Sequence, residues 1–268
     1  MDPAYDVDDA LIDEAARLLA AARHTVVLTG AGVSKESGIP TFRGKDGLWT
    51  LRGEPPLNQY QTFRQDPKRW WERRLEQQAQ PDEFATLLRA AEPNDAHFAL
   101  AGLEACGAVA HVITQNVDNL HRRAGQRALT EIHGNTRFMR CTDCHTRWPE
   151  SEVAINIEDL PPRCPERGCG GIVKGDGVMF GEPIPPDALE RCYAETLACD
   201  LFLIAGTSAV VYPAAHFPQL AVQHGVPLIE VDPEPTALSE LATVTLRGPA
   251  GELLPRLLAA VRALQAQS

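Results

Sequence analysis

A short apolar segment that runs into two closely spaced glycines constrains the fold of this chain most. Residues Thr25–Thr29 read as a buried strand, and Gly30 and Gly32 follow it directly. Glycines at such a turn let backbone N–H groups approach a pyrophosphate, and the start of a following helix adds partial positive charge. A Gly-x-Gly pair also occurs in tight turns for purely steric reasons. Because no third glycine completes the dehydrogenase fingerprint, the turn favours a site for an NAD-like dinucleotide without hydride transfer.

Apolar runs and helical patterns alternate through most of the chain. Several of the runs are unbroken, which is typical of a parallel sheet covered by helices on both faces. The sequence therefore predicts an α/β fold with a Rossmann-like, doubly wound parallel sheet. Strands are expected at residues 25–29, 108–114, 129–132, 201–205, 227–231 and 243–246, and helices at 9–22, 94–106, 117–124, 186–197, 213–224 and 251–265.

Two segments interrupt this alternation. Residues 45–88 carry three tryptophans and many charges, and residues 138–172 are rich in Cys, Pro and Gly. We interpret them as a helical insert and a metal-binding insert that together form a smaller lobe. We expect residues 1–268 to form a single domain, whose large lobe comprises about 1–44, 89–137 and 173–268. Ligands should then bind at the carboxyl ends of the large-lobe strands, beside the inserts.

The balance of charges limits the classes of partner. The 25 basic and 36 acidic residues give a formal net charge of −11, which opposes attraction to a phosphate backbone. We expect no direct nucleic-acid partner, and we interpret a local basic cluster as a solvated helix face. The start of the chain is acidic, and no apolar run approaches the roughly 20 residues of a membrane span. We therefore expect a cytoplasmic monomer without membrane contact. The basic cluster consists of Arg64, Lys68, Arg69, Arg73 and Arg74.

Four of the seven cysteines form two close pairs. Each pair can close a tight loop on one ion, and four thiolates match the tetrahedral preference of Zn²⁺. Because a filled shell leaves no position for a substrate, the metal is expected to be structural. Cys106, Cys192 and Cys199 lie in apolar surroundings and are interpreted as free thiols. The predicted zinc ligands are Cys141, Cys144, Cys164 and Cys169.

Polar side chains gather where two predicted strands end. Gln115, Asn116 and Asp118 follow one strand, and His133 follows the next. Amide and carboxylate groups at this edge of a sheet can bind ribose hydroxyls and a carboxamide. A histidine there can serve as a general base, although a histidine at a strand end is as often only a satisfied structural group.

With these motifs in order, the chain resembles the sirtuin family of NAD-dependent protein deacylases. The match extends over nearly the whole sequence and includes the four cysteines. The other matching motifs are Gly30-Ala31-Gly32-Val33-Ser34, Ser37-Gly38-Ile39-Pro40, Phe42-Arg43-Gly44, the run from Gln115 to His121, Ala124-Gly125, His133-Gly134, Phe180-Gly181-Glu182, Gly206-Thr207-Ser208 and Pro213-Ala214-Ala215.

The resemblance implies a role for each matching residue. His133 is expected to be the catalytic base, with Asn116 and Asp118 acting in catalysis beside it. Val178, Phe180, Gly181 and Glu182 are expected to lie along an acyl-peptide groove, where a bare strand edge could pair with an extended peptide. The residues expected to bind NAD are Gly30, Ala31, Gly32, Ser34, Ile39, Phe42, Arg43, Gln115, Asn116, Asp118, Gly206, Thr207, Ser208 and Asp232.

The resemblance also implies the reaction. Acyl-lysine proteins or peptides would lose their acyl group to ADP-ribose, giving nicotinamide, O-acyl-ADP-ribose and free lysine, with NAD consumed as a co-substrate. A mono-ADP-ribosyltransferase or NAD glycohydrolase on the same fold is one alternative. A non-catalytic, NAD-responsive binding module is another, but a pure binding site has no need of a base.

Two departures from the family pattern bear on specificity. Members that remove succinyl or malonyl groups carry a tyrosine and an arginine three residues later, and this chain has Arg74 and Gln77 there, with Asn58 where an alanine would open the pocket. A desuccinylase or demalonylase therefore stays an alternative, and acetyl is favoured. Asp232 stands where the family commonly has asparagine. A carboxylate there can accept from the adenosine ribose hydroxyls and would repel the extra phosphate of NADP.

Overall fold

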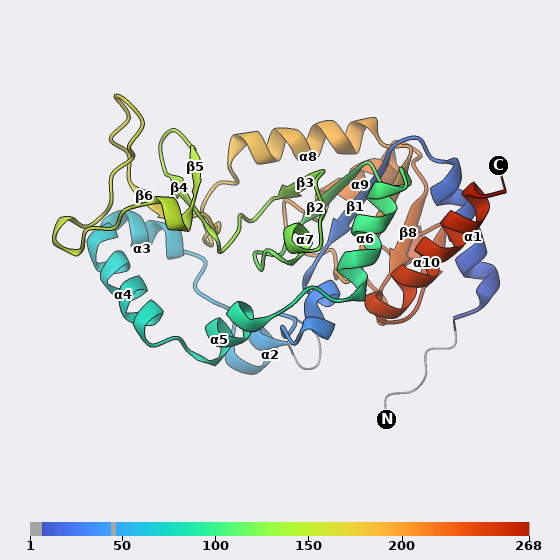
Figure 1. Ribbon diagram of the computed structural model, residues 1–268, viewed down its shortest axis with the longest axis horizontal. Coiled ribbons are helices and arrows are strands. Elements are labelled where there is room, and N and C mark those ends of the chain that lie inside the picture. The colour runs from blue at the N-terminus through green and yellow to red at the C-terminus, as the bar shows by residue number, and fades with distance from the viewer. Residues whose placement is uncertain (1–6, 44–46, 268) are drawn as a thin grey trace.

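The computed structural model describes residues 7–43 and 47–267 and shows two sheets of different size. Figure 1 shows the larger sheet with its helices at one end of the molecule and the smaller sheet at the other. Gly44 of the predicted phosphate-loop motif, and the acidic start of the chain at residues 1–6, lie outside the described residues. Among the described helices, none is long and apolar enough to cross a bilayer.

The larger sheet has six parallel strands in the order β3-β2-β1-β7-β8-β9. The chain moves outward from β1 to one side and then from β7 to the other, which is the doubly wound arrangement predicted from the sequence. The point where the order reverses lies between β1 and β7. The strands span Thr25–Thr29 (β1), His111–Thr114 (β2), Leu129–Glu131 (β3), Leu201–Ala205 (β7), Leu228–Val231 (β8) and Val244–Leu246 (β9).

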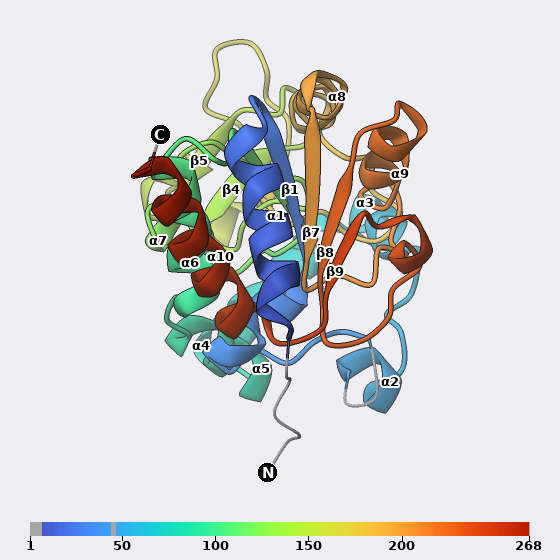
Figure 2. The same ribbon diagram turned by 90° about the vertical axis from the view of Figure 1, so that its right-hand side faces the viewer.

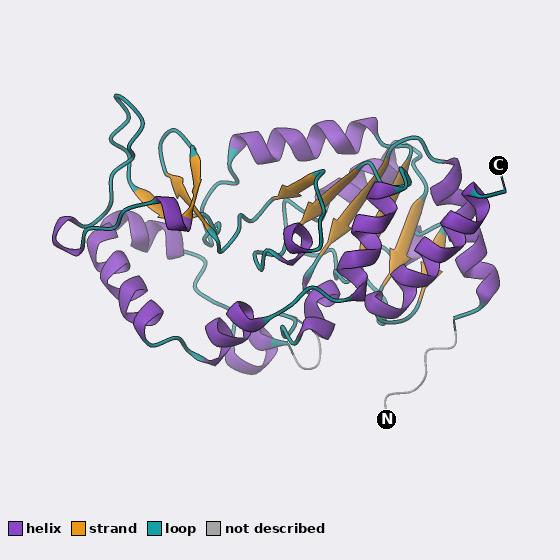
Figure 3. Ribbon diagram, viewed as in Figure 1, coloured by secondary structure: helices purple, strands orange, loops and turns teal. Residues whose placement is uncertain are grey.

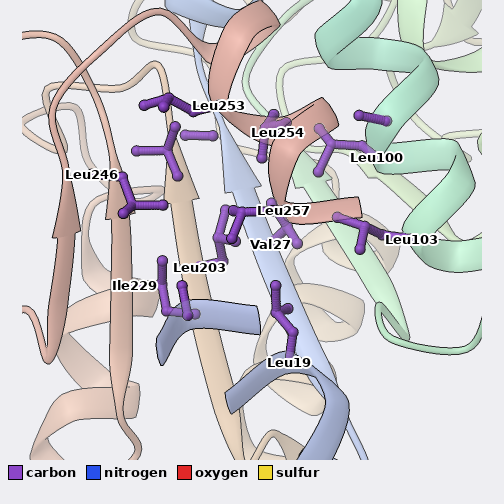
Figure 4. Packing of buried hydrophobic residues seen from close by; sticks show 14 of the residues in the cluster. Leu19, Val27, Leu100, Leu103, Leu203, Ile229, Leu246, Leu253, Leu254 and Leu257 are labelled. Carbon is purple, nitrogen blue, oxygen red and sulfur yellow. The ribbon is translucent and has the colours of Figure 1, made fainter. Parts of the chain in front are cut away.

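Helices cover both faces of this sheet because successive strand residues point to opposite sides. Val27 packs with α1, α6 and α10 on one face, whereas Val26 and Leu28 pack with α8 and α9 on the other. Figure 2 shows the two helical layers, and Figure 4 shows the leucine-rich packing between α10, α6, α1 and the strands. The helices span Asp9–Ala21 (α1), Asp95–Ala105 (α6), Pro186–Ala198 (α8), His216–Gln223 (α9) and Ala250–Gln265 (α10).

The smaller sheet is antiparallel, with the order β5-β4-β6, and Figure 3 shows it beside two helices of the first insert, α3 and α4. Trp71 is fully buried against it and donates from Nε1 to the carbonyl of Val173 at 2.9 Å. The strands are Phe138–Cys141 (β4), Arg147–Pro149 (β5) and Val173–Gly175 (β6), and the helices are Leu48–Arg52 (α2), Gln59–Gln65 (α3), Pro67–Ala79 (α4) and Glu83–Ala90 (α5).

Some elements differ from the sequence prediction. β6 pairs with β4, so the small sheet extends to Gly175, past the expected boundary at residue 172. The element after β1 is a seven-residue 3₁₀ helix, Ala31–Ser37 (η1), rather than an α-helix. The helix expected at 117–124 is only Leu120–Arg123 (α7), because Asn119 before it has a left-handed φ of 69°. The shorter 3₁₀ helices are Glu150–Glu152 (η2), Ile157–Asp159 (η3) and Ser239–Leu241 (η4).

One member of the basic cluster is not the solvated side chain that we expected. Arg74 is half-buried, and its Nη2 donates to Oε1 of Glu150 at 2.9 Å. Its guanidinium also lies 5.8 and 5.7 Å from the ring centroids of Trp70 and Trp71. Arg74 therefore joins α4 to the metal-binding insert, which contains Glu150. An arginine can do so because its aliphatic stem and planar guanidinium pack against neighbours in addition to carrying charge.

Candidate active site

The predicted site residues converge at the carboxyl edge of the large sheet. β1, β2, β3 and β7 are consecutive neighbours in the sheet, and Gly30, Gln115, His133 and Gly206 follow them within two residues. We call these four loops the carboxyl-edge cluster. Parallel strands bring their carboxyl ends together, so residues up to 176 positions apart in sequence (Gly30 and Gly206) meet here.

The two glycine turns touch each other at the point where the strand order reverses. The N–H of Gly32 donates to the carbonyl of Gly206 at 2.8 Å, and the N–H of Gly30 donates to the carbonyl of Ala205 at 3.2 Å. Gly206 has a left-handed φ of 57°, which favours glycine. A Cβ at Gly32 would lie 2.5 Å from the Cα of Gly206. The close approach therefore requires that both positions lack a side chain.

We expect Gly32→Ala to lower the affinity for NAD about tenfold or more, because the β1 and β7 turns must separate to admit the methyl group. The overpacking should also reduce the free energy of unfolding by about 1–3 kcal/mol. Calorimetric titration with NAD and thermal unfolding measure the two effects. Gly177→Ala is the matched control, since a Cβ there meets no atom within 4 Å. Equal behaviour of the two variants would contradict the steric argument.

Ser34 joins the two polar side chains that follow β2. Its hydroxyl donates to Oδ2 of Asp118 at 2.7 Å and accepts from Nδ2 of Asn116 at 3.0 Å. Nδ2 of Asn116 also donates to the carbonyl of Gly30 at 3.0 Å, which ties the β2 loop to the β1 turn. All three side chains are buried, and burial raises the pKa of Asp118. The predicted trio is therefore one connected polar unit.

Two buried histidines to which the sequence analysis gave no role of their own, His97 and His121, lie next to this unit. The rings of His97 and His121 are 5.0 Å apart, and burial lowers their pKa values to about 3 and about 4. Since the hydroxyl of Thr29 donates to Thr114, Nε2 of His121 is the donor to Thr29 at 2.9 Å. Thr114 in turn accepts from the N–H of Asn116 at 3.1 Å. Both histidines are thus neutral structural groups, recognisable in sequence only by position.

His133 is half-buried at the end of β3 and has one ring nitrogen occupied. Its Nδ1 lies 3.2 Å from the carbonyl oxygen of Gln115, which can only accept, so Nδ1 carries the proton. Nε2 is then the basic nitrogen. Burial lowers the pKa of His133, while the hydrogen bond to Gln115 opposes the shift. The side chain of Gln115 donates to Oγ1 of Thr207 at 2.8 Å, so the β2 and β7 loops are also joined.

Other residues predicted to bind NAD occupy the loops around the cluster. Ile39 is buried, and Phe42 packs on Trp49 with ring centroids 4.9 Å apart. Arg43 pairs with Glu54 at 2.9 Å. Ala31 is half-buried and Ser208 is exposed. Asp232 follows β8, and its Oδ1 accepts from the N–H of Glu234 at 3.0 Å; burial raises the pKa of Asp232.

The segment predicted to bind the acyl peptide is hydrogen-bonded to the loop that carries His133. The N–H of Val178 donates to the carbonyl of His133 at 2.9 Å, and the carbonyl of Phe180 accepts from the N–H of Tyr60 at 3.0 Å. We call residues 178–182 the substrate segment. Phe180 also contacts Trp49 edge to face, with centroids 5.5 Å apart.

Glu182 points back into the protein rather than along this segment. Its Oε2 lies 3.0 Å from Nζ of Lys174, whose side chain is 1% exposed, and accepts from the N–H of Met179 at 2.8 Å. Lys174 also donates to the carbonyls of Gly175 and Gly177, both at 2.9 Å. The sequence analysis missed Lys174, whose burial no local pattern indicates.

The four predicted zinc ligands come together as expected. Their sulfur atoms all lie within 4.8 Å of one another, and the Cys141–Cys169 and Cys144–Cys164 pairs are each 3.6 Å apart. Four thiolates at about 2.3 Å from a tetrahedral Zn²⁺ would be about 3.8 Å from each other. The donor set and its spacing therefore fit a structural zinc ion.

This fold and site define a Rossmann-like dinucleotide-binding protein with a four-thiolate lobe. The chain matches the model of the Sir2 family over residues 30–213, and it belongs to that family. The resemblance to the sirtuins is thereby confirmed.

Known proteins resemble the chain over almost its whole length. An NAD-dependent protein deacylase 2 from Pyrobaculum aerophilum is 42% identical over 250 residues, which cover 92% of this chain and 94% of the relative. The crystal structure of a Sir2 homologue in complex with NAD is 43% identical, with a TM-score of 0.75, and the match covers 97% of this chain and 95% of that one. A Sir2 complex with deacetylated p53 peptide and 3′-O-acetyl-ADP-ribose is 33% identical, with a TM-score of 0.74 and coverage of 92% and 97%.

Proposed function

We propose that this chain is an NAD-dependent protein-lysine deacylase that favours acetyl groups and releases nicotinamide, O-acyl-ADP-ribose and free lysine. One observation carries the proposal. His133 presents a basic Nε2 at the carboxyl edge of the sheet, and its own carbonyl holds the N–H of Val178 in the substrate segment. A base fixed between a dinucleotide turn and a peptide-binding segment is what acyl transfer to ADP-ribose requires.

The glycine turns would hold the dinucleotide. The N–H groups of Gly30, Gly32 and Gly206 are engaged in the turns themselves, so the pyrophosphate would bind other backbone N–H groups of the β1 and β7 turns. Ser208 and Asp232 would reach the adenosine side. Phe42, Arg43 and Ile39 would cover the nicotinamide region. The connected Ser34, Asn116 and Asp118 unit would orient the nicotinamide ribose, since every member is held by at least two hydrogen bonds.

The chemistry then divides into two steps. The bond between ribose C1′ and nicotinamide breaks, and the acyl carbonyl oxygen of the lysine amide bonds to C1′. Nε2 of His133 next takes the proton from a ribose hydroxyl, whose oxygen attacks the carbon of the resulting imidate. The C–N bond breaks as the lysine amine leaves with that proton, and water adds to the same acyl carbon. The bond between this carbon and the C1′ oxygen then breaks, which leaves the acyl group as an ester on the second ribose oxygen. A base with a pKa below its usual value is unprotonated and ready at neutral pH.

The buried Lys174–Glu182 pair would set the shape of the substrate segment. It fixes the Met179 N–H and the turn at Gly175 and Gly177, and the N–H groups of Val178 and Phe180 donate to His133 and Gln59. An extended peptide would pair with the remaining backbone groups of the segment. By this account Glu182 positions the segment and does not contact substrate itself.

The surroundings of α4 favour a neutral acyl group. Arg74, one of the two cations that could have met an acyl carboxylate, is occupied by Glu150 and packed against two tryptophans. A carboxylate contact needs a correctly placed guanidinium. We also place the protein in the cytoplasm, because zinc binding through four thiolates requires reduced cysteines. We further propose that it is a monomer.

Incubation of the protein with NAD and a panel of acyl-lysine peptides tests the proposal. We expect nicotinamide release that depends on peptide, with kcat/KM for acetyl-lysine above that for succinyl-lysine. Peptide-independent release would indicate an NAD glycohydrolase, and transfer of ADP-ribose to protein a mono-ADP-ribosyltransferase. Preference for succinyl would identify a desuccinylase, and NAD binding without turnover a binding module. Long-chain acyl peptides complete the panel.

A further inference from the structure

A second cleft lies between α7 and the first two strands of the small sheet. It has a volume of about 630 Å³, and the side chains that define its chemistry are Asn119, Arg122, Arg123, Arg137, Phe138 and Glu150. None of them belongs to the residues expected to bind NAD, peptide or zinc. The cleft therefore presents a separate set of side chains, whose role the proposed deacylase activity does not account for.

The cleft is basic although the chain as a whole has a net charge of −11. Three of its lining residues are arginines, and its one lining carboxylate, Glu150, is already occupied. Oε1 of Glu150 accepts from Arg74 and from Gln78, both at 2.9 Å. The side chains that line the cleft therefore carry more positive than negative charge.

The three arginines keep donors available. Nη2 of Arg122 binds Glu131 at 2.9 Å, but the same carboxylate oxygen also accepts from Arg147 at 2.7 Å. Arg147 also pairs with Oδ2 of Asp176 at 2.8 Å, so Arg122 is ion-paired with Glu131 but keeps further N–H groups that can donate. Arg123 binds Glu92, whose side chain is 74% exposed. Arg137 has no side-chain partner among the contacts of the described residues, and each guanidinium carries five N–H donors.

An aromatic ring and an amide complete the lining. Arg147 lies over the ring of Phe138, 4.0 Å from its centroid, and Arg122 lies 5.7 Å from it. Oδ1 of Asn119 accepts from Nδ2 of Asn135 at 2.9 Å, so the amide NH₂ of Asn119 is left to donate. The cleft thus combines several cationic donors with one apolar surface.

We propose that this cleft binds a small organic phosphate. Guanidinium groups bind phosphate oxygens through paired, charge-assisted hydrogen bonds, and more than one arginine can share a doubly charged group. The Phe138 ring would contact the organic part of the ligand. The volume is within the range of roughly 300–1,000 Å³ that small-molecule sites occupy.

Phenyl phosphate is a suitable probe, titrated by calorimetry into the full-length protein already saturated with ADP-ribose. ADP-ribose fills the carboxyl-edge cluster, so that the remaining heat reports the second cleft. We expect one equivalent to bind, and Arg137→Gln to weaken binding about tenfold or more, the weight of one charge-assisted hydrogen bond. Thermal unfolding verifies that this exposed variant stays folded.

Arg69→Gln is the matched control, because it removes the same charge from an exposed arginine on α4 and should change the affinity less than about twofold. The proposal is overturned by equal losses in the two variants, by absence of wild-type binding at millimolar probe, or by binding that ADP-ribose abolishes. Since no acyl peptide is present, these outcomes are independent of the proposed deacylation, and the preceding titration of ADP-ribose tests the cofactor site separately.

Discussion

Replacing His133 with alanine is expected to lower peptide-dependent nicotinamide turnover by about 10²–10⁴-fold, the usual contribution of a general base, while the protein stays folded. The ring is held by one hydrogen bond, from Nδ1 to the Gln115 carbonyl, so its removal should cost little stability. Steady-state kinetics with an acetyl-lysine peptide and thermal unfolding measure the two effects. Binding of NAD should persist, because no turn residue changes.

His224→Ala is the matched control for this variant. His224 also places Nδ1 near a backbone carbonyl, that of Leu220 at 2.8 Å, but it is exposed at the end of α9. It should turn over like the wild type. A His133→Ala enzyme that kept full turnover would remove the imidazole from the base role.

The pH profile of the wild type gives an independent reading of the same residue. A base acts in its unprotonated form, and burial lowers the pKa of His133 below the ordinary value of about 6.5. The acid limb of kcat/KM should therefore lie below pH 6.5, with a plateau at neutral pH. An acid limb centred above pH 7 would be inconsistent with this histidine as the base.

Much of the fold could be predicted because the strands of the large sheet are short, unbroken apolar runs in the sequence. Val26, Val27 and Leu28 form an unbroken apolar run, and the structure buries them on two opposite faces. The carboxyl-edge cluster follows from that sheet, since loops after parallel neighbours must meet. The ends and types of some elements were harder to predict, because backbone conformation decides them. The left-handed φ of Asn119 makes α7 begin later than expected, and a 3₁₀ helix, η1, follows β1.

The residues missed by sequence reasoning share a physical cause. The structural roles of His97, His121 and Lys174 depend on burial, and His121 and Lys174 also act through side-chain partners outside their own elements, Thr29 and Glu182. No periodicity or spacing indicates such burial. Glu182 is a residue that the sequence analysis did identify, but its orientation could not be predicted. Its motif predicts a place along the acyl-peptide groove, and the structure shows its carboxylate turned inward to Lys174.

Removing the metal is expected to unfold the small sheet and abolish deacylation, although no zinc ligand touches the carboxyl-edge cluster. Among the described residues, the hydrophobic cluster against the small sheet has five buried members, namely Trp71, Met139, Cys141, Cys164 and Val173. Two of them are ligands, so apolar burial alone is a weak source of stability here. Structural zinc contributes about 10–16 kcal/mol in small zinc-binding peptides. Cys164→Ala should therefore lose the metal, measured by elemental analysis, and the folded lobe with it.

Strand β6 connects the zinc site to the substrate segment and, through it, to His133. Val173 pairs with Cys141, and the substrate segment begins at the third residue after β6. A melted β4–β6 pair therefore releases the Lys174–Glu182 anchor and the Val178 contact to His133. Hydrogen exchange should show the amides of β4 and β6 exposed in Cys164→Ala. The amides of β1 and β7 should stay protected, since these two strands pack in hydrophobic clusters separate from that of the small sheet. Cys192→Ala, which removes a buried thiol from the α8 face, should keep metal and activity. A metal-free chain that deacylated at the wild-type rate would show that the thiolates do not hold the substrate segment in place.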